Sequence, residues 1–188
     1  VIVSTPVLQI LDIVKRIAPF LKPDTILTDV GSTKKTLAEE VKKVLPPYVY
    51  YIGGHPMAGR EKSGLAAAQK DLFRNKWYIV IPSSDTPVEK TDILCKIIKM
   101  TGAFITFMDA KTHDNCAAVI SHVPHVAAAA LVNLLASCPD ADANLKLAGG
   151  GFRDTTRIAS SNADMWADIC ITNSGSIAHS LGEFQKIL

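Results

Sequence analysis

A histidine surrounded by glycines is the first candidate for chemistry in this sequence. His55 stands within Gly53–Gly59, where three of seven residues are glycine. Glycines allow the backbone to approach a ligand closely, and an imidazole can accept a proton near neutral pH. A turn that carries a surface histidine is the alternative interpretation. We favour a general base at His55, because so many special residues are gathered in one short segment.

A serine occupies a comparable position earlier in the chain. Ser32 follows Gly31, after an apolar run and before a stretch with helical spacing. Ligands of open α/β sheets bind where strands end and helices begin, so Ser32 is a candidate site residue. The alternative is purely structural, with Ser32 as a helix cap and Gly31 in a tight turn.

Two histidines three residues apart form the third candidate. His122 and His125 lie in Ser121–His125, and their spacing would suit a metal. No Cys, Asp or Glu at ligand spacing completes such a site, so no metal is expected. Pro124 suits the first turn of a helix, whose N–H groups and dipole favour an anion. We therefore expect a helix N-terminus that helps to hold an anionic substrate.

The fourth candidate is an arginine that follows a run of glycines. Gly149–Gly151 predicts a mobile or tightly apposed loop, and Asp154 and Arg157 come shortly after it. A guanidinium is suited to binding a carboxylate, and Asp154 could hold it in place. A surface Asp–Arg pair of little energetic value is the alternative.

The elements that position the first two candidates alternate between strand and helix. Strands are expected at Val1–Val3, Thr25–Val30, Val49–Ile52, Trp77–Ile81 and Ala103–Met108. Helices are expected at Val7–Leu21, Lys34–Leu45 and Val88–Met100. This alternation predicts a parallel sheet with crossover helices, so residues 1–108 are expected to form part of a Rossmann-type α/β domain.

From about residue 109 onward the pattern is helical throughout. His113–Ser121 and Pro124–Ala136 are apolar on several faces, and Trp166–Leu188 is amphipathic. Helices that are apolar on more than one face need burial on more than one side. An all-helical domain over residues 109–188 that forms a homodimer is therefore expected.

Composition excludes several classes of protein. The 188 residues are 48% hydrophobic and 20% charged with a formal net charge of +2, which does not indicate a nucleic-acid surface. The four cysteines are widely spaced, as in a reduced cytoplasmic protein. The longest apolar stretch, around Val126–Leu135, is too short to span a bilayer, so no membrane is expected.

Taken together and in order, these segments resemble the prephenate and arogenate dehydrogenase family over nearly the whole chain. The matching motifs are Asp29-x-Gly31-Ser32, Gly53-Gly54-His55-Pro56-Met57-Ala58-Gly59-x-Glu61-x-Ser63-Gly64, Leu72-Phe73 with Trp77, His113-Asp114, Ser121-His122-x-x-His125, Gly150-Gly151-Phe152-x-Asp154-x-Thr156-Arg157 and Met165-Trp166. One such motif is weak evidence, whereas the ordered set is specific.

The resemblance implies oxidative decarboxylation of prephenate to 4-hydroxyphenylpyruvate, or of arogenate to tyrosine, with NAD or NADP. It implies that His55 takes the proton of the ring hydroxyl, that Ser32 positions His55 near the nicotinamide, and that Thr5-Pro6 lies near the cofactor. It further places these residues at the substrate: Arg157, Asp154, His125, Ser121, Trp166 and Glu61.

One family feature is absent, and two other interpretations are kept. The Gly-x-Gly-x-x-Gly turn would lie upstream of Val1, so we expect a piece that binds dinucleotide poorly by itself. Nothing in the sequence distinguishes NAD from NADP. A different two-domain dehydrogenase, of the 3-hydroxyacid or 6-phosphogluconate type, would usually rely on a lysine base in its helical domain. A non-catalytic dimerisation module is the alternative from another class.

Overall fold

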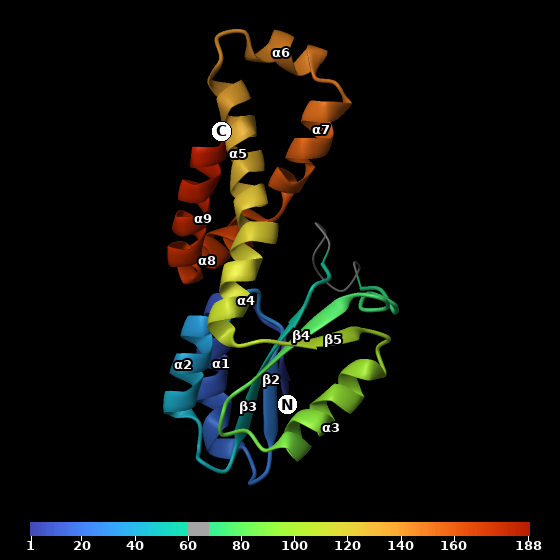
Figure 1. The fold of residues 1–188 in the computed structure, drawn as a ribbon, viewed down its shortest axis with the longest axis vertical. Coiled ribbons are helices and arrows are strands. Elements are labelled where there is room, and N and C mark those ends of the chain that lie inside the picture. Colours follow the sequence, from blue (N-terminus) through green and yellow to red (C-terminus); the bar gives the residue numbers. More distant parts are fainter. Residues whose placement is uncertain (60–67) are drawn as a thin grey trace.

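A mixed sheet and a set of helices above it make up the two parts of the protein (Figure 1). The computed structural model describes residues 1–59 and 68–188. Five strands form the sheet within these residues, in the order in which they follow along the chain. They are β1 (Ile2–Val3), β2 (Ile26–Asp29), β3 (Tyr50–Pro56), β4 (Trp77–Pro82) and β5 (Phe104–Phe107). The Rossmann-like α/β part predicted from the sequence is confirmed.

One pair of neighbouring strands departs from the predicted parallel arrangement. β1, β2 and β3 are parallel, and so are β4 and β5, but β4 runs antiparallel to β3. Pro56 at the end of β3 pairs with Tyr78 near the start of β4. The start of β4 therefore lies beside the end of β3. Two neighbouring strands that are connected in this way run in opposite directions.

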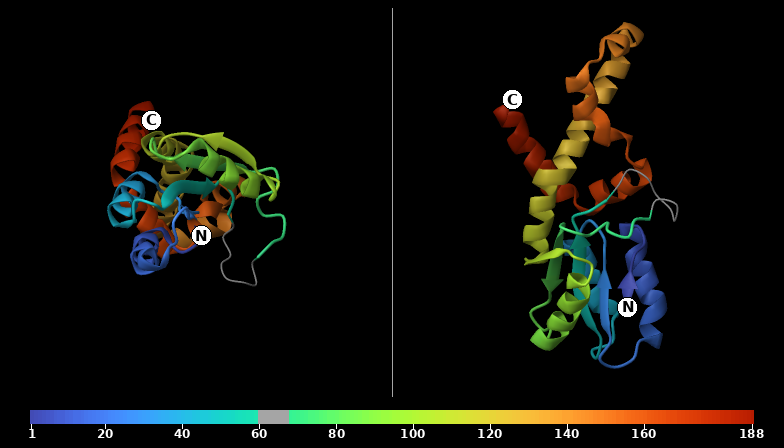
Figure 2. Two further views of the ribbon diagram at one scale, coloured as in Figure 1. Left: turned by 90° about the horizontal axis from the view of Figure 1, so that it is seen from below. Right: turned by 90° about the vertical axis from the view of Figure 1, so that its right-hand side faces the viewer.

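Helices cover both faces of the sheet. α1 (Val7–Ile17) and α2 (Lys35–Val44) lie on one face, and α3 (Val88–Lys99) lies on the other (Figure 2). Each face has its own core, because apolar residues recur at helical spacing along these helices. The core beneath α1 and α2 is built from Val3, Val7, Ile10, Val14, Leu27, Leu37, Val41 and Val49. The core beneath α3 is built from Ile52, Tyr78, Val80, Leu94, Cys95, Ile98 and Ala103.

The helical part is organised around one long helix. α4 (Ala110–Ala117), a π-helical segment (Ala118–His122) and α5 (Val123–Ser137) run on without a break. The two separate helices predicted here are in fact one. The remaining helices are α6 (Ala141–Leu147), α7 (Gly150–Thr156), a 3-10 turn (Arg157–Ser160), α8 (Ala163–Thr172) and α9 (Ser174–Ile187).

Much of the apolar surface of this long helix is exposed. Ile120 and Leu134 are 65% and 63% exposed, and Val119 is similar. By length and composition alone the helix Ala110–Ser137 could cross a membrane, contrary to the expectation from the shorter apolar stretch. A helix that packs against a second subunit has the same length and apolar composition. The exposed apolar surface is therefore consistent with either a lipid bilayer or a second protein subunit as its neighbour.

The two parts are joined directly after β5. Asp109 caps α4, because its carboxylate accepts hydrogen bonds from the backbone N–H groups of Lys111 and Thr112. α2 has no cap of its own. The carboxylate of Asp114, on α4, accepts hydrogen bonds from the N–H groups of Lys34 and Lys35, at 2.8 and 2.9 Å. The helical part thus caps a helix of the α/β part.

Candidate active site

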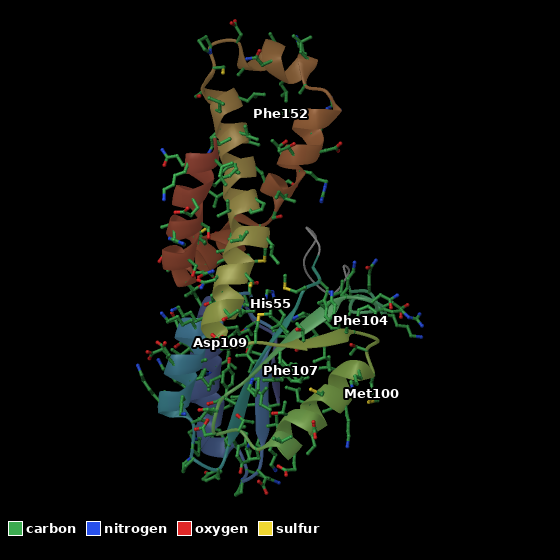
Figure 3. The ribbon with its side chains drawn as sticks, in the orientation of Figure 1. His55, Met100, Phe104, Phe107, Asp109 and Phe152 are labelled. Carbon is green, nitrogen blue, oxygen red and sulfur yellow. The ribbon has the colours of Figure 1, made fainter. Side chains whose placement is uncertain are left out.

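β3 carries His55 to the end of the sheet that faces the helical part (Figure 3). The glycine before it is required by close packing. A Cβ atom added to Gly54 would lie 2.6 Å from the backbone oxygen of Asp29 and 2.8 Å from the hydroxyl of Tyr78. Gly54 therefore lets β3 lie tightly against β2 and β4, and His55 takes its position from that packing.

The ring of His55 is held by two residues of α4. Its Nδ1 lies 2.8 Å from Nε2 of His113, and Nδ1 of His113 lies 2.7 Å from Oδ1 of Asp114. His113 is fully buried and Asp114 is 2% exposed. A carboxylate and two imidazoles thus form a hydrogen-bonded row that starts in the helical part and ends at the sheet.

A buried ion pair lies close to this row. Lys34 and Asp29 are both fully buried, and the lysine Nζ donates a hydrogen bond to the Asp29 carboxylate. That carboxylate also accepts from the backbone N–H groups of Gly31 and Gly54 and from the hydroxyl of Tyr51. Buried charges persist in proteins when they are paired and hydrogen-bonded in this way.

These surroundings keep His55 neutral. Burial holds the pKa of its imidazole well below 6.5, and the positive charge of Lys34 lowers that pKa further, followed by His113 and His122. A neutral imidazole at the end of a strand can accept a proton over the whole physiological range of pH.

A second cluster of rings lies beside the row. His125 stacks on Trp166, with ring centres 3.6 Å apart and planes 4° from parallel, and His122 meets the same indole edge-on at 5.9 Å. Within residues 1–59 and 68–188, two buried nitrogens of this cluster have no hydrogen-bond partner, Nδ1 of His125 and Nε1 of Trp166. Buried polar atoms are almost always paired, so these two point to a ligand.

His122 is held differently from His125. Asn173 donates its side-chain amide to the backbone oxygen of Asp114 at 2.7 Å and to Nδ1 of His122 at 3.2 Å. Burial lowers the pKa of His122 to about 4. Among the residues that the structure describes, no three His, Cys, Asp or Glu side chains are grouped as metal ligands.

The other predicted residues lie at several places around these clusters. Thr5 follows β1, and its buried hydroxyl has no partner among the described residues. Pro6 is the N-cap residue directly before α1. Ser32 is half-buried in the bend before α2. Among the described residues, the ring of His55 is hydrogen-bonded to His113 through Nδ1, and no hydrogen bond joins it to Ser32. A positioning role for Ser32 therefore stays a prediction.

The residues predicted to bind carboxylate lie on the helical part. Asp154 is exposed on α7, and Arg157 begins the 3-10 turn that follows it. The backbone of Ile158, the next residue, contacts the ring of His125. Arg157 thus directly precedes a residue whose backbone contacts the ring cluster, while a substrate-binding role for its guanidinium and its pairing with Asp154 stay predictions. Glu61 lies outside the described residues.

Three local expectations are wrong. Ser121 and His125 do not begin a helix, because they lie inside the continuous helix, where the backbone N–H groups are engaged within the helix. The glycine run is not a loop, since Gly150 and Gly151 form the first turn of α7. Ser32 does not cap α2, which begins after Lys34 and is capped by Asp114.

Sequence reasoning missed the row behind His55. His113 and Asp114 form a motif to which the sequence assigns no role, and Lys34 is predicted only as the start of a helix. The available signal was a His-Asp pair just after the start of a helix, in a segment expected to be buried. Only the fold shows that this pair lies behind His55.

Comparison with known proteins identifies the family of the chain. Residues 1–107 match the family described as prephenate dehydrogenase, nucleotide-binding domain, and residues 109–188 match prephenate dehydrogenase, dimerization domain. The chain belongs to the prephenate dehydrogenase family. The predicted resemblance is therefore confirmed, and the interpretation as a 3-hydroxyacid-type dehydrogenase is not supported.

Individual members of the prephenate dehydrogenase family are similar over nearly all of this chain. Prephenate dehydrogenase from Bacillus subtilis is 40% identical over 98% of this chain, which spans 50% of that protein. The Aquifex aeolicus prephenate dehydrogenase in complex with hydroxyphenyl propionate and NAD+ is 34% identical with a TM-score of 0.91, over 98% of this chain and 64% of that one. Synechocystis arogenate dehydrogenase is 31% identical with a TM-score of 0.85, over 98% and 66%. The chain thus spans about half the length of its curated relatives.

Proposed function

We propose that this chain is the catalytic and dimer-forming part of an NAD(P)-dependent prephenate dehydrogenase, which converts prephenate to 4-hydroxyphenylpyruvate in tyrosine biosynthesis. The observation that carries the proposal is the neutral imidazole of His55, fixed at the end of β3 by His113. Family membership and the ring cluster with two unpartnered nitrogens support it.

His55 serves as the base that removes the proton from the ring hydroxyl. As this O–H bond breaks, the hydrogen on the same carbon leaves as hydride, and the carbon–oxygen bond becomes a carbonyl. Hydride loss is easier from a carbon whose oxygen is giving up its proton, so the base must act in the same transition state. The low pKa of His55 ensures that the imidazole is free to accept this proton at pH 7.

Loss of carbon dioxide then completes the reaction. The bond between the ring and its carboxylate breaks, and its electron pair passes through the ring to the carbonyl oxygen. That oxygen takes a proton back from His55 to become the phenol, so the imidazole is neutral again after each turnover. The gain of aromaticity drives this step, and no further acid is required.

The substrate is held from the helical part. Prephenate carries two carboxylates, and the guanidinium of Arg157 would bind one of them, with Asp154 holding that side chain in place. Glu61 would gate or support the site. The unpartnered Nδ1 of His125 and Nε1 of Trp166 are suited to hydrogen-bond the substrate. Ser121, one turn before His125 on the same helix, would line the same space.

The residues at the ends of the first strands fit a dinucleotide. The buried hydroxyl of Thr5, after β1, and that of Thr28, in β2, have no partner among residues 1–59 and 68–188. They lie toward the carboxyl ends of parallel strands, where dinucleotides bind in such sheets. Thr5, Pro6 and Ser32 would hold the cofactor, and NAD or NADP would supply the acceptor of the hydride.

Replacement of the base tests the proposal directly. In the complete protein, His55→Asn should lower kcat for prephenate oxidation by about 10²- to 10⁴-fold, the usual contribution of a general base, with a small change in KM. Formation of reduced cofactor is measured by its absorbance. The exposed His179 of α9 provides a matched control, since His179→Gln should leave the rate unchanged. Undiminished turnover in His55→Asn would disprove the assignment.

Arogenate is the alternative substrate, because it differs from prephenate only where an amino group replaces the side-chain keto group. The similarity to Synechocystis arogenate dehydrogenase keeps it in consideration. The ratio of kcat/KM for the two substrates, measured with each of NAD and NADP, decides both questions. We favour prephenate, since Bacillus subtilis prephenate dehydrogenase is the more similar at 40% identity.

A cytoplasmic homodimer is the assembly that we propose. The exposed apolar residues of the long helix, Val119, Ile120 and Leu134 among them, belong to the part that matches a dimerization domain. A second copy would cover them with a matching surface, and lipid would not be needed.

A further inference from the structure

In the row Asp114–His113–His55, the chemistry of the side chains fixes which group donates each hydrogen bond and which accepts it. The carboxylate of Asp114 accepts hydrogen bonds from the N–H groups of Lys34 and Lys35, so it acts as an acceptor throughout. His113 must then donate its Nδ1–H to that carboxylate. A neutral His113 is left with a bare Nε2, which can only accept. His55 therefore donates its own Nδ1–H to it across 2.8 Å.

We infer that His113 and Asp114 are positioning residues that hold His55 in the Nδ1–H tautomer, so that its bare Nε2 faces the substrate hydroxyl. This inference deepens the proposed function and rests on it for the identity of the substrate. The tautomer itself is a property of the protein alone. Imidazole side chains in water favour the opposite tautomer, with the proton on Nε2, which cannot accept a proton at that atom.

The same row stabilises the charge that catalysis creates. When Nε2 of His55 takes the substrate proton, the ring becomes a cation with a proton on each nitrogen. Its Nδ1–H continues to donate to His113, whose own Nδ1–H donates to the carboxylate of Asp114. The carboxylate thus opposes the new positive charge through one intervening ring, as a buried aspartate does in a hydrolase triad.

Asp114 makes the tautomer depend on how the two parts of the protein fit together. Its two oxygens cap α2 of the α/β part, while its backbone oxygen accepts from Asn173, which precedes α9. His55 comes from the sheet and His113 from α4. The base is therefore set in its productive form only when the helical part is seated against the sheet.

Histidine NMR tests the tautomer without any substrate. The protein has five histidines, so ring ¹⁵N signals of a ¹⁵N-histidine sample can be resolved and His55 identified by its loss in His55→Asn. At pH 8, His55 should carry its proton on Nδ1 in the wild-type protein. In His113→Leu the proton should move mostly to Nε2, whereas His113→Gln, whose amide oxygen can still accept, should keep it on Nδ1. The exposed His179→Gln should change nothing at His55.

Kinetics in the complete protein supply the second measurement. His113→Leu should lower kcat for prephenate by about 10²-fold at nearly unchanged KM, as for groups that orient a reactive histidine. His113→Gln should recover most of the rate. A wild-type His55 protonated on Nε2, or a tautomer unchanged by His113→Leu, overturns the inference; if His113→Leu does not fold, the wild-type and His113→Gln spectra still decide. The expected tautomers without prephenate oxidation would instead disprove the proposed function.

Discussion

At the scale of single residues, the candidate base is defined by the charged and titratable groups around it. Lys34 approaches from the segment before α2, His113 from α4 and His122 from the π-helical segment, and all three lower the pKa of His55 in addition to burial. Asp114 meets His113 and not His55 itself. Every direct influence therefore favours the neutral imidazole.

This environment predicts an unusual pH profile. The protonated form of His55 cannot act as a base, so activity is lost as pH falls through its pKa. Since that pKa lies well below 6.5, kcat/KM for prephenate should stay high below pH 6.5, where an ordinary histidine is already half-protonated. The profile of kcat/KM between pH 4.5 and 8 measures this in the complete protein. An acidic limb centred at or above pH 6.5 would contradict it.

At the scale of elements, the site depends on how closely β3 can lie against its neighbours. The antiparallel pairing of β3 with β4 puts Tyr78 opposite Pro56, and the hydroxyl of Tyr78 lies where a side chain at Gly54 would be. A π-helical segment then follows α4. Such segments are frequent at functional sites, and this one ends at the buried His122.

Gly54→Ala should therefore destabilise the protein. The added methyl would meet the backbone oxygen of Asp29, which cannot move freely, so we expect a loss of about 1–3 kcal/mol in the free energy of unfolding. Gly59→Ala is the matched control, because its Cβ has no described atom within 4 Å; its effect should stay within about 0.5 kcal/mol. Urea unfolding followed by circular dichroism measures both. Equal free energies of unfolding for the two variants would show that β3 can accommodate a methyl group at residue 54.

At the scale of the whole molecule, the helical part contributes residues to the candidate site and also carries an exposed apolar surface. It supplies His113 and Asp114 to the site, and its long helix carries exposed apolar side chains, Ile120 and Leu134 among them. Large apolar surfaces of this kind mark interfaces, and those of obligate homodimers resemble a divided core. The proposed dimer and the proposed base would thus depend on the same helix.

A charge placed in that surface should disrupt the dimer. Leu134 is 63% exposed on α5, and Leu134→Glu would bury a charge without a partner at the proposed interface. Light scattering at micromolar concentration should report a dimer for the wild-type chain and a shift toward monomer for the variant. Met100→Glu, at an 86% exposed position at the end of α3, should leave the mass unchanged. A wild-type protein of monomeric mass would refute the proposed assembly.

The fold class could be predicted from the sequence alone, and the sequence also indicates the candidate chemical residues. Apolar residues at helical and strand spacing defined the α/β part and the helical part after residue 108, since periodic burial depends on neighbours along the chain. The glycines around His55 and the glycine run before Arg157 drew attention to an imidazole and a guanidinium, whose chemistry suits a base and a carboxylate-binding group. Such signals are local, and local signals can be followed without coordinates.

Contacts between residues far apart in the chain could not be predicted from the sequence. The pairing of His55 with His113 joins positions 58 residues apart, and Asp114 meets Lys34 from 80 residues away. The direction of β4 and the unbroken helix through Ser121 likewise follow from packing between segments. A hydrogen bond between distant residues leaves no periodic trace in the sequence, because its partners are brought together by the burial of other side chains.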